Sequence, residues 1–124
     1  MLKQETKSLE IRKRYQDFLL WLFEKINNFP KKQKFLLGDR IGNLALDILE
    51  DIIIIQFSRP DYKKEKLKAF NLKLEILRDL MRLAWRMKFF SHKSFLYQES
   101  KIDEIGRMVY GLACPKSVEG TVEV

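Results

Sequence analysis

The sequence is poor in the residues that cross-link chains, bind metals or interrupt helices. Its one cysteine, Cys114, excludes an intrachain disulfide and a metal cluster built from thiolates. His92 is the only histidine, and neither a metal-site spacing nor a glycine-rich phosphate loop occurs. With only 5 glycines and 3 prolines in 124 residues, the chain has few places to turn. We therefore expect one domain built from a few long elements.

The sequence also lacks long apolar segments and an activated nucleophile. Residues 1–10 are polar and contain no apolar signal core, and the longest apolar runs are too short to span a bilayer. Cys114 lies beside Pro115 without a base to activate it, and a lone histidine is more often solvated or capping than catalytic. We expect a cytoplasmic protein without a membrane partner that is not an enzyme, with no catalytic residue, metal site or cofactor.

What the sequence does contain is a surplus of positive charge. Lysine and arginine number 24 against 17 acidic residues, which gives a formal net charge of +7 and a pI near 9.5. Such a surplus on a small body concentrates polyanions around it. Nucleic acid and an acidic protein both fit this charge, and many basic proteins bind no polyanion at all, so the charge narrows the class of partner without naming it.

Hydrophobic periodicity predicts four helices, at residues 6–28, 31–56, 63–88 and 92–112. Pro30 ends the first helix and suits the first turn of the second, while Ser91 is the predicted N-cap of the fourth. The run Ile52–Ile55 suits a strand by residue type, but the upstream apolar pattern continues through it in helical register. Short connections between such helices favour an antiparallel up-down four-helix bundle, an all-α fold of residues 1–112 with a flexible tail at 113–124.

The second and third predicted helices have unusually wide apolar arcs. Each arc covers more of the circumference than packing against a single core requires. Either these helices lie deep in their own bundle or another subunit covers part of each face. The aromatic residues of the apolar positions, which we expect in the core, are Phe18, Trp21, Phe23 and Trp85.

The basic residues form three groups, which are candidate polyanion-binding residues. Those groups are Arg12, Lys13 and Arg14; Lys31, Lys32 and Lys34; and Arg78, Arg82 and Arg86. The second group lies at a predicted helix start, where the helix dipole already favours anions, so it is a reasonable phosphate site.

The third group, here called the arginine row, repeats every four residues along one helix face. Neighbouring like charges on a helix repel each other, so a partner must offset them or solvent must screen them. Two partners fit the row, and both suit the planar guanidinium. One is the phosphates of nucleic acid, and the other is the acidic row of the second helix, within or between chains. That acidic row consists of Asp39, Asp47, Glu50 and Asp51.

Several segments together resemble the accessory variability determinant (Avd) proteins of diversity-generating retroelements. They are Phe29-Pro30-Lys31, Phe35, Leu37-Gly38, Arg40-Ile41, Leu77-Arg78, Leu80, Arg82-Leu83-Ala84 and Glu104-Ile105-Gly106-Arg107, with Tyr15 and Trp21. The resemblance covers about residues 12–112. It implies four-helix bundles assembled into a homopentameric barrel with a basic surface.

The resemblance also implies a function. Avd proteins bind the reverse transcriptase of the retroelement and nucleic acid, RNA or DNA, and support error-prone copying of template RNA. This chain would then be a noncatalytic partner of the polymerase. Its three basic groups would be the nucleic-acid or polymerase surface, an assignment that rests on charge alone. A barrel would account for the wide apolar arcs, and Gly38, Gly42 and Gly106 would allow close helix approach within or between subunits.

Two alternatives remain open at this point. Four-helix proteins encoded within ribosomal RNA intervening sequences look similar in fold, but typically carry an Asn-Ile-Ala-Glu-Gly segment near the end of the second helix. Here that region is Glu50-Asp51-Ile52-Ile53-Ile54-Ile55, a departure that favours Avd. The other alternative is an oligomeric adaptor that binds only proteins and whose charges pair internally or between chains.

Overall fold

Four long helices make up the fold in the computed structural model, which describes residues 2–114 and their side chains from Thr6 onward. They are α1 (Leu2–Asn27), α3 (Asp39–Phe57), α4 (Pro60–Arg86) and α5 (His92–Ala113). The short helix α2 (Lys31–Gln33) and one turn of π-helix, η1 (Lys34–Gly38), join α1 to α3. The part of the chain described contains no strand, so the predicted all-α class is confirmed.

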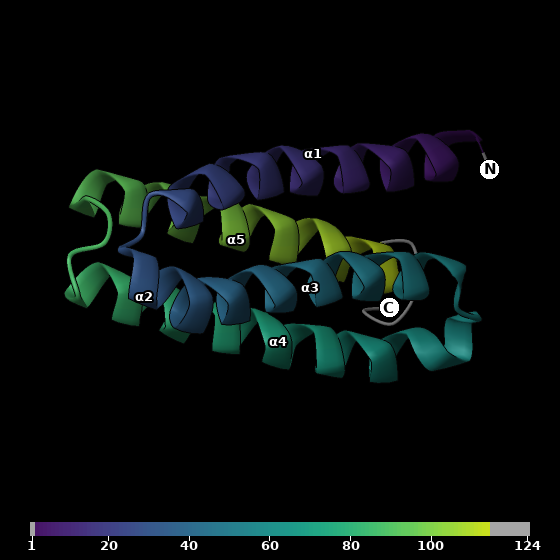
Figure 1. Ribbon diagram of the computed structural model, residues 1–124. Helices are drawn as coiled ribbons and strands as arrows, with labels where there is room; N and C mark the ends of the chain where they lie inside the picture. Colours follow the sequence, from purple (N-terminus) through teal and green to yellow (C-terminus); the bar gives the residue numbers. More distant parts are fainter. Residues whose placement is uncertain (1, 115–124) are drawn as a thin grey trace.

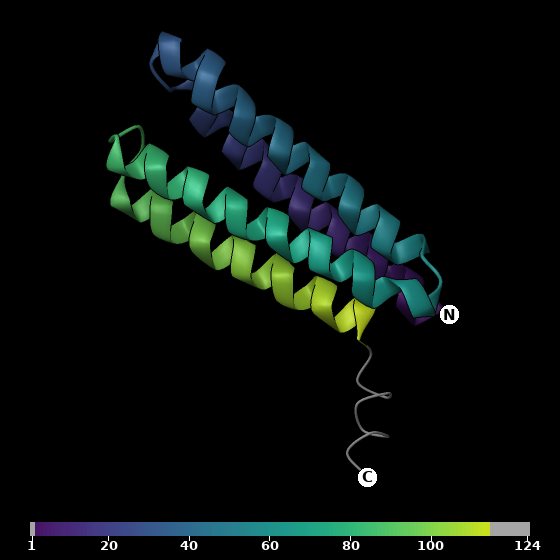
Figure 2. The ribbon, with the colours of Figure 1, turned by 90° about the horizontal axis from the view of Figure 1, so that it is seen from below.

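The helices run alternately up and down the bundle. Each long helix packs against the one before it, and α5 returns to pack against α1 (Figure 1). Figure 2 shows the same four helices from below, with short connections at both ends. This arrangement is the predicted four-helix bundle. The pentameric barrel stays a prediction.

Several helix ends differ from the predicted ones. Helix α1 begins at Leu2, before the predicted Thr6, and α4 begins at Pro60 instead of Lys63. Pro60 is the first residue of α4, where its missing N–H costs no hydrogen bond. The N-cap role of Ser91 is confirmed, because Ser94 N donates to Ser91 Oγ at 3.1 Å. Helix α5 continues to Ala113, inside the predicted tail, and the rest of that tail, 115–124, lies outside the described residues.

Helix α4 ends at Arg86 because the chain turns left-handed two residues later. Lys88 has a φ of 67°, and its N–H donates to Trp85 O at 2.8 Å. The N–H of Phe89 donates to Ala84 O at 3.0 Å. These two bonds form a Schellman motif, which satisfies carbonyls at a helix end and prevents the helix from continuing. The predicted end at Lys88 was therefore two residues too late.

The second predicted helix contains one turn of π-helix, η1, between α2 and α3. In this turn the N–H of Asp39 lies within bonding distance of Lys34 O, five residues back, which is the π-helical pattern. Gly38 closes the turn against α1. A Cβ on Gly38 would lie 2.8 Å from Ile26 Cγ2, so only glycine lets the two segments approach this closely.

The core lies between the four helices and draws residues from each of them. Its largest fully buried side chains are Tyr15, Phe18, Leu22, Ile41, Ile48, Ile52, Ile55, Phe70, Leu77, Met81, Ile102 and Ile105. Tyr15 Oη donates to Ala45 O at 2.6 Å and so joins α1 to α3. Burial raises the pKa of this hydroxyl above its ordinary value, and the charge of Asp51 adds to the shift.

The core aromatics follow the prediction only in part. Phe18 is buried, whereas Trp21 and Trp85 are half-buried and Phe23 is exposed. The isoleucine run is helical, with Ile52 and Ile55 inside.

Candidate functional site

The arginine row lies along α4 on the side that faces α5. Arg78 contacts Glu75 Oε1 at 3.2 Å and Asp103 Oδ1 of α5 at 2.7 Å. Arg82 contacts Asp79 Oδ1 at 2.7 Å. Its second amino group lies 3.9 Å from a carboxylate of α5, that of Glu99.

The acidic row of the second predicted helix is therefore not the partner of the arginine row within the chain. Of that acidic row, Asp51 is the member with an ion pair among residues 6–114, and its partner is Lys73 of α4 at 3.0 Å. Lys73 and the arginines lie on different sides of α4, one toward α3 and the other toward α5. The rotation of α4 about its axis decides the pairing, and sequence spacing does not fix that rotation.

The three arginines differ in how readily an outside anion could reach them. Arg78 is half-buried and has two carboxylate neighbours, whereas Arg86 is exposed and has no ion pair among residues 6–114. Exposed ion pairs contribute about 0–1 kcal/mol each, so phosphate can exchange with the carboxylates that Arg82 contacts. At Arg86 a phosphate has no carboxylate to displace, because this residue has no ion pair among residues 6–114.

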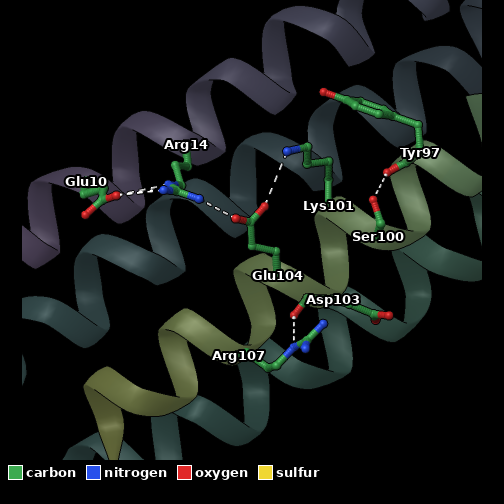
Figure 3. A network of polar contacts seen from close by, with 8 residues as sticks. All are labelled: Glu10, Arg14, Tyr97, Ser100, Lys101, Asp103, Glu104 and Arg107. Atoms are coloured by element: carbon green, nitrogen blue, oxygen red, sulfur yellow. Dashed lines mark hydrogen bonds and ion pairs between the residues drawn. The ribbon is translucent and has the colours of Figure 1, made fainter.

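The first basic group does not form a single patch, because consecutive residues point about 100° apart around a helix. Arg14 binds Glu10 of its own helix at 2.9 Å and Glu104 of α5, and Glu104 also contacts Lys101 (Figure 3). Hydrogen bonds to Glu10 and Glu104 raise the pKa of Arg14. Lys13 is exposed without an ion pair among residues 6–114, and Arg12 is half-buried with its Nε unpaired in that range.

The second basic group surrounds α2. Lys31 and Lys32 are exposed, while Lys34 is half-buried and its Nζ donates to Asn27 Oδ1 at 3.1 Å. The predicted phosphate site relied on the dipole of a long helix. The structure keeps such a helical run, because α2, η1 and α3 follow one another without a break and the residues at their junctions are right-handed helical. The group remains a candidate by charge, beside the exposed Phe35 and Leu36.

The outer faces of α3 and α4 carry apolar side chains at the surface. On α4 the residues concerned repeat every three to four positions: Leu72, Ile76, Leu83 and Met87, with Leu80 half-buried between them. On α3 they are Leu46, Ile54 and Phe57. Of the two explanations for the wide apolar arcs, deep burial in the chain's own bundle is excluded. Exposed apolar stripes of this kind are typical of surfaces that bind other proteins.

The three candidate packing glycines make their close contacts within the chain. Gly38 abuts Ile26, and a Cβ on Gly42 would lie 3.8 Å from Ile26 Cδ1. A Cβ on Gly106 would lie 3.4 Å from Leu74 Cδ1. Gly106 also lies in an open groove of about 470 Å³ between α4 and α5.

Groups of the kind that bind metals do not occur in residues 2–114. In that range no three histidine, cysteine or carboxylate residues gather closely enough to hold an ion. Nor does the same range contain a helix with the length and apolar character needed to cross a bilayer.

Comparison with known proteins gives one match. A protein-family model described as bAvd-like matches residues 9–115, which include nearly all of the four helices. The chain belongs to the bAvd-like family. This confirms the resemblance to Avd proteins drawn from the sequence. No curated protein and no solved structure gives a match.

Two of the segments that carry the resemblance meet in the groove of this bAvd-like bundle. Arg78 of α4 lines the groove together with Gly106 and Arg107 of α5. Arg107 is exposed, and its Nε lies 3.5 Å from Asp103 O (Figure 3). The groove thus contains arginine from both helices, balanced by Glu75 and Asp103.

Sequence reasoning missed a further basic surface of the bAvd-like bundle, at the connection between α3 and α4. We call it the α3–α4 corner, and it consists of Phe57, Arg59, Tyr62, Lys63, Lys64, Lys66 and Lys68. The signal is present in the sequence, because residues 59–68 contain five basic residues. It escapes notice when residues 58–61 are interpreted only as a break between helices.

Proposed function

We propose that this bAvd-like protein is a noncatalytic accessory of a diversity-generating retroelement. In this proposal it binds nucleic acid and the reverse transcriptase in the cytoplasm and supports mutagenic copying of template RNA. The family match over residues 9–115 carries the proposal. The formal net charge of +7 supports the nucleic-acid part, because that charge attracts polyanions irrespective of their sequence.

We further propose that the chain assembles into a ring, with the homopentamer of the family resemblance as the expected form. The exposed apolar residues of α3 and of α4 form two sets, and in the proposed ring the set of one subunit contacts the other set of its neighbour. Contact between two different faces is heterologous, and a heterologous contact generates a closed ring when its rotation closes. Burial of Leu72, Leu83 and Ile54 would remove from water apolar surface that the single chain leaves exposed.

The three basic groups are the proposed nucleic-acid or polymerase contacts, and the arginine row is the first choice among them. Arg82 and Arg86 are exposed on the same helix. Arginine suits a phosphate strand or an acidic polymerase surface because its guanidinium binds two oxygens in parallel.

The test is binding of a labelled structured RNA to the purified full chain, titrated at several salt concentrations. We expect a steep decrease of affinity with salt, by roughly 0.7–0.9 units of log–log slope per phosphate contact. Arg82→Ala with Arg86→Ala should reduce that slope by about 1.4–1.8 and also weaken binding of a purified retroelement reverse transcriptase. The matched control is Arg40→Ala, an exposed arginine of α3 without an ion pair among residues 6–114.

The outcomes separate the parts of this proposal. RNA affinity that is absent even at low salt contradicts nucleic-acid binding, and unchanged affinity in the double variant contradicts the assignment to the arginine row. Light scattering of the same samples measures the assembly, and a monomer at working concentration contradicts the ring.

A protein-only oligomeric adaptor is the second candidate. The observation in its favour is that Arg78 and Arg82 already contact carboxylates of their own chain. This candidate predicts assembly without RNA affinity. The family match favours Avd over the intervening-sequence type.

A further inference from the structure

The α3–α4 corner gathers positive charge that has no ion-pair partner in the described part of the chain. Its segment, residues 59–68, contains five basic residues and two acidic ones. None of the five forms an ion pair among residues 6–114, whereas Arg14, Arg78 and Arg82 all do. The positive charge of the corner is therefore less compensated than that of these three arginines.

Two aromatic rings lie exposed on either side of the same connection. Phe57, the last residue of α3, is 78% exposed, and Tyr62, in the first turn of α4, is 48% exposed. The guanidinium of Arg59 lies over the Tyr62 ring, 5.8 Å from its centroid. Exposed rings among unpaired cations are what single-stranded nucleic acid requires, because its bases stack on aromatic faces while its phosphates pair with lysine and arginine.

The backbone holds these side chains in place. Only Ser58 and Arg59 separate α3 from α4. Ser58 Oγ donates to Ile54 O at 2.6 Å, and Tyr62 N donates to Arg59 O at 2.9 Å. Pro60 starts the helix with a fixed φ. A short connection with satisfied backbone groups loses little conformational entropy when a ligand binds.

The arrangement of the lysines fits a single strand of nucleic acid better than the flat surface of an anionic membrane. Lys64 and Lys68 are one helical turn apart, about 6 Å along α4, while Lys66 points to another side of the helix. The two acidic residues of the segment, Asp61 and Glu65, are exposed among them. A strand can contact the cations one at a time, whereas an anionic membrane surface would meet these carboxylates together with the lysines.

We propose that the α3–α4 corner binds a single-stranded segment of nucleic acid. Phosphates lie on its lysines and Arg59, and bases stack on Phe57 and Tyr62. The inference rests on the proposed function in taking nucleic acid as the partner. It adds a contact for single strands, however, on a surface apart from the three basic groups singled out in the sequence.

The charge test compares two lysine pairs in the full chain. Lys64→Gln with Lys66→Gln removes two corner cations, and the control, Lys88→Gln with Lys93→Gln, removes two exposed lysines at the other end of the bundle. Binding of a short, unstructured, labelled RNA is measured by anisotropy at several salt concentrations, with DNA of the same sequence alongside. The corner pair should lower the log–log slope by about 1.4 and the control pair by much less.

The ring test uses Phe57→Leu with Tyr62→Leu, which keeps apolar side chains but removes both rings. Single-strand affinity should fall roughly 5- to 150-fold, the equivalent of about 1–3 kcal/mol for a stacked base. Tyr62→Phe keeps the ring and should bind normally. Blunt duplex RNA, whose bases are already stacked, should be much less affected. Thermal unfolding followed by circular dichroism verifies that each variant is folded.

Three results would overturn the inference, and they differ in what they imply for the proposed function and for the kind of ligand. If the chain binds RNA but the corner pair behaves like the control pair, the site is wrong and the proposed function stands. If the chain binds neither RNA nor DNA at low salt, both fail. If vesicles containing phosphatidylserine bind more tightly than RNA, and the same substitutions abolish that binding, the corner is a membrane contact.

Discussion

The two ends of the bundle both contain phenylalanines, but these differ in how far they are buried. At the end that contains α2, Phe29 is only 4% exposed. Its ring lies 5.1 Å from that of Phe89 and 6.3 Å from that of Phe90. At the other end, where α3 is followed by α4 (Figure 1), Phe57 of the α3–α4 corner is exposed. The α2 end, here called the closed end, thus packs three phenylalanine rings together and leaves Phe35 exposed, whereas the corner leaves both of its aromatic rings exposed.

The connections account for this difference. At the closed end the chain passes through the Schellman turn at Lys88, which directs Phe89 and Phe90 back against the core. At the corner only Ser58 and Arg59 lie between α3 and α4. Two residues are enough to reverse the chain and too few to cover a ring. The closed end therefore contributes stability, and the corner contributes accessible surface.

The largest difference in stability between the two ends is expected when one phenylalanine is replaced at each of them. Phe29→Ala removes a buried ring and leaves a cavity, which should lower the free energy of unfolding by about 3–5 kcal/mol. Phe57→Ala removes an exposed ring and should change it by about 0.5 kcal/mol or less. Urea unfolding followed by circular dichroism measures both. Equal losses would mean that Phe57 is covered in the assembled protein, and the comparison would then fail.

A smaller effect is expected from alanine at two glycines. At the closed end, Gly38→Ala places a Cβ against the branched side chain of Ile26, and such overpacking should cost about 1–3 kcal/mol. A Cβ on Gly111, in the last turns of α5, would meet no side chain of residues 6–114 within 4 Å. Gly111→Ala should stabilise by about 0.5–1 kcal/mol, because alanine favours helix over glycine. Thermal unfolding of both variants measures these changes, and a stabilising Gly38→Ala would show that η1 can relax.

The last effect is absent at neutral pH and concerns the hydroxyl of Tyr15, which lies between the two ends and depends on neither. Burial keeps its hydroxyl neutral in the folded chain, since it raises the pKa above the ordinary value of 10.0. In the unfolded chain this group loses its proton near pH 10. Its contribution to stability is thus complete below pH 10 and decreases by about 1.4 kcal/mol per pH unit above it. Tyr15→Phe should remove that slope in alkaline unfolding experiments, and an unchanged slope would contradict the burial argument.

Helix content and topology could be predicted from the sequence because local patterns determine them. The isoleucines Ile52–Ile55 continue an established helical register, and Ser91 has the hydroxyl that an N-cap needs. The start of α4 was predictable in principle, because a proline such as Pro60 suits the first helical position. The π turn was not, since it depends on how closely Gly38 approaches Ile26 in three dimensions.

The candidate surfaces were less predictable than the fold. Spacing placed Arg78 and Arg82 on one face of a helix, and that was correct. Their partners, among them Asp103, depend on which neighbour that face meets, and this follows from packing. The lysines of the corner have no such partner among residues 6–114, although a count of charges treats them and the arginines alike. What distinguishes the two sets is the distance to the nearest carboxylate, which only the structure supplies.

The even number of long helices has a practical consequence. The beginning of α1 and the end of α5 lie at the same end of the bundle, the one that contains the corner (Figure 2). A purification tag or fluorescent protein attached before α1 or after α5 is therefore connected to the bundle at the end that contains the corner. Such a fusion can obstruct the binding of a nucleic-acid strand at the corner, and a basic tag can bind the strand itself. Binding experiments accordingly need tag-free protein, with any dye attached at an exposed position of the closed end, such as Lys93.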